Sequence, residues 1–195
     1  MSLCKPGFVR SRILLLVVSA LIVGGCSSSV TKIVDPKNKK IAFVYGYINM
    51  NEAKARLSWV ALRRYRPSAQ RYGSDIIDGT FFQSDGIFFH IGVDLGTYQV
   101  ERFGSNANSG YFYTFGASGK NVTARNINKP GLHYMGAYKY ISEKDRWGRA
   151  KKFSMKQTKQ PTEKELLTAL LKHVKYHYSE YPQQINWIEQ RLAQL

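Results

Sequence analysis

Cysteine and histidine are the side chains of this sequence with the most distinctive chemistry, and both are few. The 195 residues include two cysteines, Cys4 and Cys26, and four histidines. His173 and His177 stand four residues apart, which would place both imidazoles on one face of a helix and would suit a metal ion. The zinc-protease pattern needs a glutamate after the first histidine, and Val174 stands there instead. We therefore predict no metal site and interpret the pair as surface histidines of a helix.

The other residues that could take part in catalysis have simpler structural interpretations. The sequence contains no Gly-x-Ser-x-Gly elbow of the kind that presents a nucleophilic serine. Asp75, Asp78 and Asp85 could bind calcium or act as glycosidase carboxylates, but each stands beside or near a glycine, where aspartate favours turns. His90 and His133 are predicted to face outward from strands. We therefore predict no catalytic residue and no cofactor.

The second cysteine ends a segment with the layout of a secretory signal peptide. Three basic residues come first, residues 13–23 form an apolar run, and Gly24 and Gly25 precede Cys26. The run is too short for an ordinary membrane-spanning helix, which needs about 20 apolar residues. We expect residues 1–25 to be a signal peptide that is cleaved between Gly25 and Cys26.

The residues Val23-Gly24-Gly25-Cys26 resemble the lipobox of bacterial lipoproteins, which is an aliphatic residue, two small residues and an obligatory cysteine. In that family a diacylglyceryl group is attached to the cysteine sulfur, and the new amino terminus is acylated after cleavage. The resemblance implies lipidation of Cys26, and several acyl chains together make a durable membrane anchor. Because Ser27 rather than aspartate follows, the resemblance implies the outer membrane of a Gram-negative cell. The alternative is a plain signal peptide, or a short anchor, with an incidental cysteine.

The charge of the chain is strongly basic. Three of the 29 basic residues fall within the expected signal peptide, which leaves an excess of 13 over the 13 acidic residues. Much of the excess lies in residues 54–71 and 144–159. Such patches would suggest nucleic acid in a cytosolic protein. An exported lipoprotein instead meets lipid headgroups and anionic glycans, so we predict no nucleic acid. A solvated basic surface without a specific ligand is the alternative.

Residues 26–40 are expected to form the lipidated N-terminus and a flexible tether, and residues 41–142 the folded domain. Seven or eight short runs rich in β-branched and aromatic residues, separated by turn dipeptides, predict an antiparallel β-sandwich or barrel. Cys26 would be the remaining cysteine, so no internal disulfide is possible. In the run 97–103, alternation predicts that Tyr98 and Val100 face the core and that Gln99 and Glu101 face solvent.

Residues 143–195 are expected to form a basic linker followed by helices that pack on the domain. Thr162 and Glu165 make a capping box at the start of the first helix, whose apolar face is formed by leucines and Val174. Pro182 suits the first turn of a second helix. Such a helical pair could also contact a partner or a membrane, but packing on the domain is the preferred interpretation.

Two segments are similar to prealbumin-like domains, which include carboxypeptidase-regulatory-like and transthyretin-like modules. Residues 89–100 resemble their passage from strand to short turn to Gly-x-Tyr to strand, with Asp94 and Leu95 in place of the usual prolines. Residues 128–136 are similar to a later strand segment flanked by glycines. The resemblance implies an antiparallel β-sandwich that serves as a binding or structural module, and it transfers no catalytic residues.

Alternating tyrosines either fill the core of this domain or form a binding face; they are Tyr111, Tyr113, Tyr134, Tyr138 and Tyr140. We expect them in the core.

These observations together predict a lipid-anchored bacterial envelope protein of the outer membrane and periplasm, attached through Cys26. It would be a non-catalytic binding or structural module. Its partner would be an envelope protein, an anionic glycan or lipid headgroups. An envelope hydrolase that acts on a cell-wall or lipid substrate is the alternative.

Overall fold

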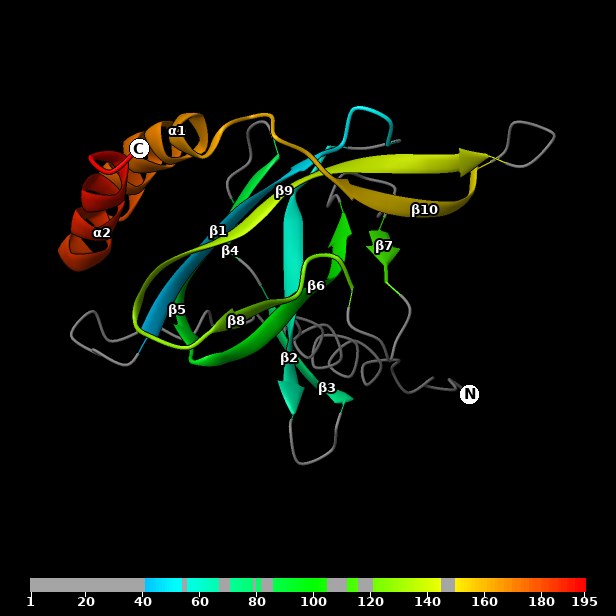
Figure 1. Cartoon of the computed structure of the whole chain (residues 1–195), viewed down its shortest axis with the longest axis horizontal. Helices are drawn as coiled ribbons and strands as arrows, with labels where there is room; N and C mark the ends of the chain where they lie inside the picture. Colours follow the sequence, from blue (N-terminus) through cyan, green and yellow to red (C-terminus); the bar gives the residue numbers. More distant parts are fainter. Residues whose placement is uncertain are drawn as a thin grey trace, which may run out of the picture. The chain divides into compact units, whose positions relative to one another are not determined.

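The computed structural model describes residues 41–53, 56–66, 71–78, 80–81, 86–104, 112–115, 121–144 and 150–195. All of them belong to one compact unit, Val34–Leu195. They form two β-sheets followed by a pair of C-terminal helices (Figure 1). Neither helix in these ranges has the length and apolarity needed to span a bilayer. The predicted signal peptide and tether lie outside the described residues.

The first sheet has five strands in the order β10-β9-β1-β5-β4. Strand β1 is central, pairs in parallel with β9 and in antiparallel with β5, and so has a neighbour on both sides. The other two pairs, β10 with β9 and β4 with β5, are antiparallel. The strand bounds are β1 Ile41–Asn49, β4 Thr80–Phe81, β5 Ile87–Asp94, β9 Gly131–Lys144 and β10 Ala150–Gln157.

The second sheet has the order β3-β2-β6-β7, and β8 also pairs with β6. All of its pairs are antiparallel. The bounds are β2 Trp59–Arg66, β3 Arg71–Asp78, β6 Gly96–Gly104, β7 Phe112–Thr114 and β8 Arg125–Ile127. Only Leu95 separates β5 of the first sheet from β6 of the second, so the chain passes from sheet to sheet in a tight turn.

Strand β1 is buried on both faces. Its side chains alternate between two hydrophobic cores, with Ala42 and Val44 in one and Phe43 and Tyr45 in the other. All residues of 41–45 are at most 2% exposed. This explains the unbroken apolar run in the sequence, because a strand covered on both sides has no solvent face on which to place polar residues.

The first core lies between the two sheets and contains Val44, Phe88 and Tyr138 from one sheet and Leu62 and Val100 from the other. The sheets therefore pack face to face in a sandwich-like arrangement.

Aromatic rings fill much of this first core. Tyr138 and Tyr140 are buried in it, and Tyr113 packs against it. The ring of Tyr113 lies 4.7 Å from that of Tyr140 and 5.3 Å from that of Phe103, measured between centroids. Tyr134 packs against the second core. The prediction that alternating tyrosines fill the core is confirmed for these four residues, and Tyr111 lies outside the described residues.

The second core lies between the first sheet and the two helices, α1 Glu163–His177 and α2 Pro182–Leu192. The predicted capping box at the start of α1 is present, and Pro182 occupies the first turn of α2. Helix residues Leu167, Leu170, Val174 and Ile188 pack with Phe43, Tyr45 and Phe89 of the sheet. Both helices thus pack on the first sheet.

Two glycines make the double burial of the first sheet possible. Gly92 in β5 and Gly136 in β9 are the extra residues of two bulges beside β1, with φ angles of +85° and +115°. A bulge shifts the alternation by one residue, so Tyr134 faces the helices while Tyr138, four residues later, faces the second sheet. A Cβ at Gly136 would lie 2.7 Å from the Tyr138 hydroxyl oxygen, so both conformation and space favour glycine.

The prediction that Gln99 and Glu101 face solvent is wrong, because they are only 1% and 2% exposed. Glu101 is the extra residue of a bulge, since Val100 pairs with Leu62 and Arg102 with Ala61. Its carboxylate forms an ion pair with Arg63 at 2.5 Å.

The side chains of Asn121 and Thr123 cover the stretch of β6 that lies between its pairings with β7 and β8. The Thr123 hydroxyl accepts from the Val100 N–H at 2.8 Å, and the Asn121 side-chain amide donates to the Val100 carbonyl at 2.7 Å. Gln99 Oε1 accepts from the Asn121 backbone N–H. These hydrogen bonds attach residues 121–123 to β6, so the segment has a structural role.

Two strands, β3 and β10, stand where no strand is predicted. Strand β10 falls in the expected basic linker, and Phe153 and Met155 alternate there with Lys152 and Lys156. The two apolar residues pack against or within the first core, while the two lysines are exposed. Apolar and charged residues therefore alternate along β10 as in an ordinary half-buried strand, although the segment is rich in lysine. Strand β3 contains the backbone of Asp75 and Asp78, whereas the neighbouring glycines predict turns there.

Candidate functional site

The predicted attachment site, Cys26, and the predicted cleavage site, Gly25 and Cys26, lie outside the described residues. Lipidation and cleavage therefore stay predictions. Asp85 also lies outside the described part, and Asp75 and Asp78 are described by their backbone alone. No group of three or more histidine, cysteine, aspartate or glutamate side chains that could hold a metal ion occurs within the described ranges.

His90 is the histidine whose position differs from expectation, because it is buried rather than facing outward, with 3% exposure. It shares a face of β5 with Phe88, and it hydrogen-bonds to the backbone of Val60 in the opposite sheet. Its Nε2 atom has no hydrogen-bond partner among the described residues. Burial lowers the pKa of His90 to about 4, although the bond to Val60 opposes this shift. His90 is therefore a neutral core residue at neutral pH.

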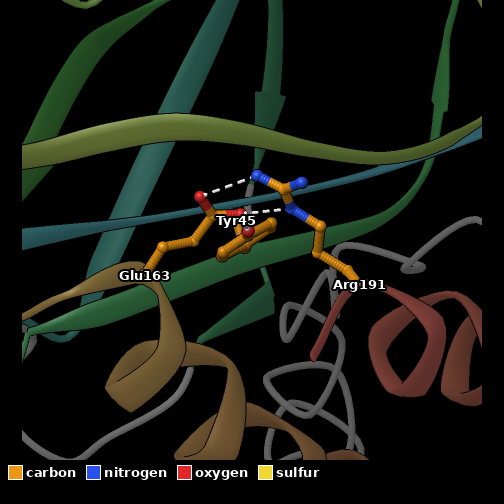
Figure 2. A network of polar contacts seen from close by, with 3 residues as sticks. All are labelled: Tyr45, Glu163 and Arg191. Carbon is orange, nitrogen blue, oxygen red and sulfur yellow. Dashed lines mark hydrogen bonds and ion pairs between the residues drawn. The ribbon is translucent and has the colours of Figure 1, made fainter. Parts of the chain in front are cut away.

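Three polar side chains meet where the helices join the first sheet: Tyr45 on β1, Glu163 on α1 and Arg191 on α2 (Figure 2). The Tyr45 hydroxyl donates to Glu163 Oε1 at 2.8 Å. Arg191 donates from Nε to the same oxygen at 2.8 Å and from Nη2 to Glu163 Oε2 at 3.1 Å. The paired, parallel geometry of the guanidinium and carboxylate is the stronger form of this interaction. We call these three residues the helix clamp.

The electrostatics of the helix clamp hold its groups in fixed protonation states. Burial and the bond to Glu163 raise the pKa of Tyr45 far above its ordinary value. Burial alone would raise the pKa of Glu163, but the bonds from Arg191 and Tyr45 outweigh it and the pKa is lowered. Tyr134, whose ring stacks on Tyr45 at 5.2 Å, has its pKa raised to about 12, mainly by burial.

An efficient general acid or base has a pKa near the working pH, and all of these shifts lead away from neutrality. Both oxygens of Glu163 also already accept hydrogen bonds. The arrangement therefore suits a fixed structural contact that holds α1 and α2 against β1.

Arg64 on β2 holds the turn that carries the predicted Gly-x-Tyr passage. Its Nη2 donates to the Leu95 carbonyl at 2.7 Å, and its guanidinium carbon lies 5.9 Å from the centre of the Tyr98 ring. A Cβ on Gly96 would lie 2.8 Å from Arg64 Nε, so glycine leaves the space in which the guanidinium sits. Arg63 and Arg64, which both belong to the basic segment 54–71, thus make internal contacts.

The basic segment at residues 144–159 contributes charge to the surface. Lys152 and Lys156 on β10 are exposed and alternate with the core-facing Phe153 and Met155. Lys139 on β9 lies opposite Lys156 and forms an ion pair with Glu52 at 2.7 Å. The outer face of the β9–β10 pair therefore presents lysine side chains, with Glu143 opposite Lys152.

Comparison with protein-family models, with curated proteins and with solved structures finds no match for this chain.

We predict that the helix clamp stabilises the domain through hydrogen bonds to a charged group. Tyr45→Phe should lower the free energy of unfolding by about 1 kcal/mol, and Glu163→Gln by about 2 kcal/mol. The double variant should lose less than the sum, because both changes remove the same bond. Urea denaturation measures these values. The control Glu180→Gln, an exposed carboxylate near the α1–α2 connection, should change stability by less than about 0.5 kcal/mol. Unchanged stability in Tyr45→Phe would contradict the prediction.

We also predict that His90 makes the domain less stable in mild acid. The unfolded chain binds a proton near pH 6.5 and the folded chain only near pH 4, so stability is lost as pH falls between these values. At pH 5 the loss should be about 2 kcal/mol relative to pH 7.5. Urea midpoints of wild type and His90→Gln at the two pH values measure it.

In this comparison His90→Gln should lose most of the pH dependence, whatever its stability at pH 7.5. His133→Gln, which changes a partly exposed histidine with Nε2 2.7 Å from the Lys129 carbonyl oxygen, should retain it. An equal pH dependence in wild type and His90→Gln would show that other groups are responsible.

Proposed function

We propose that this chain is a lipid-anchored bacterial envelope protein that binds an anionic envelope component and catalyses no reaction. The observation that carries the proposal is the order of features at residues 5–29: basic residues, an apolar run, Val23-Gly24-Gly25-Cys26 and a serine-rich stretch. With Cys4 removed in the signal peptide, Cys26 is the cysteine that remains for attachment. By the same resemblance, the outer membrane is the proposed location.

The fold supports a binding module, and we propose that it is of the prealbumin-like type. Two sheets share one core, and the chain crosses between them through the turn at Leu95, which leads directly into Gly96 and Tyr98 of β6. The prolines usual in that turn are missing here. The hydrogen bond from Arg64 to the Leu95 carbonyl supplies a restraint at the same place.

The proposed partner follows from the exposed charge. Lys152 and Lys156 extend from β10 on the side opposite the core, and an anchored protein is held next to anionic headgroups. Each lysine near an anionic membrane surface contributes about 1 kcal/mol of attraction. The polar clusters around Glu163, Glu101 and Asn121 are occupied by contacts inside the domain, and a non-catalytic role is consistent with this use.

Metabolic labelling with a palmitate analogue in a Gram-negative host tests the anchor. Wild type should incorporate the label and Cys26→Ala should lose it completely, because the acylation depends on this sulfur. Cys4→Ala is the matched control, since it removes a cysteine from the predicted signal peptide and should leave labelling unchanged. An unlabelled wild type, or a labelled Cys26→Ala, would refute the proposal.

A further inference from the structure

The last turn of α1 brings two imidazole rings together on the surface. The ring centroids of His173 and His177 lie 4.4 Å apart, with the ring planes tilted by 43°. His177 is exposed and His173 is half-buried.

The surrounding aromatic rings fix this arrangement. His173 packs against Phe89 of the sheet at 5.8 Å and against Tyr178 at 5.9 Å, both measured between ring centroids. The ring of Tyr176 meets His177 at 4.6 Å. Helix α1 itself is held to the sheet by the helix clamp. Two ligands on a rigid backbone lose little conformational entropy when both bind the same ion.

The chemistry of the pair favours a borderline transition metal. Neutral imidazole is a good ligand for Zn²⁺ and Cu²⁺, and histidines four apart on a helix are the pair used in zinc proteases. The nearby cation Lys175 is paired with Glu189 at 2.6 Å, which offsets its repulsion of a metal ion.

We propose that His173 and His177 form a two-ligand surface site for Cu²⁺ or Zn²⁺, with water completing the coordination. The histidine spacing already suggests this chemistry, although no metal site is predicted because the zinc-protease glutamate is missing. The adjacency of the rings and their aromatic packing are the observations that change the conclusion. This site does not depend on the lipid anchor.

Metal titration of the full-length chain in detergent tests the site. The melting temperature should rise by about 3–6 °C at a metal concentration tenfold above the dissociation constant. Cu²⁺ should bind more tightly than Zn²⁺. His177→Gln changes an exposed side chain, so it should fold normally and bind at least about 10-fold more weakly, because the second ligand is lost.

His133→Gln is the matched control and should retain the metal-induced rise. Electron paramagnetic resonance of the Cu²⁺ complex should show two nitrogen ligands in wild type and one in His177→Gln. Two results would overturn the proposal: no rise in wild type at millimolar metal, or an equal rise in His177→Gln, which would place the bound ion elsewhere.

Discussion

The structure depends on the burial of strand β1 on both of its faces. Ala42 and Val44 need cover on one side and Phe43 and Tyr45 on the other, so neither the second sheet nor the helix pair can be removed without exposing apolar surface. Because β1 and β9 are parallel, the chain between them must cross over, and it does so by forming the whole second sheet together with β4 and β5 of the first. The bulges at Gly92 and Gly136 change the face on which the following side chains of β5 and β9 lie, so that both strands contribute to the same two cores.

The helix pair is joined to β1 by more than apolar contact. In the helix clamp, one carboxylate on α1 accepts from a tyrosine of the sheet and an arginine of α2, so three elements share a single charged group. Hydrogen bonds to a charged group contribute more than neutral ones. The clamp holds the start of α1 against the sheet, and near the other end of this helix the His173 ring packs on Phe89. The clamp is a structural feature, and the proposed metal site lies at the opposite end of the same helix.

Much of the fold could be predicted from local patterns, and the failures have physical causes. The capping box and Pro182 located both helices because helix ends depend on neighbouring residues. Strand β10 was missed because its lysines obscured a period of two, and Glu101 because a bulge interrupted the alternation. The prediction that His90 faces outward fails because alternation cannot show that both faces of a sheet are covered. No local sequence pattern predicts the helix clamp, since Tyr45 and Glu163 are 118 positions apart. The attachment site at Cys26 rests on the sequence pattern alone.

Amide hydrogen exchange tests the central claim most directly, because it reports how much of the domain must open to expose each strand. The amides of residues 42–45 in β1 should exchange only through global unfolding, with an opening free energy equal to that from urea denaturation. Those of residues 152–156 should exchange faster, because β10 is at the edge of the sheet. Exchange of the β1 amides as fast as those of β10 would contradict the burial of β1 between two cores.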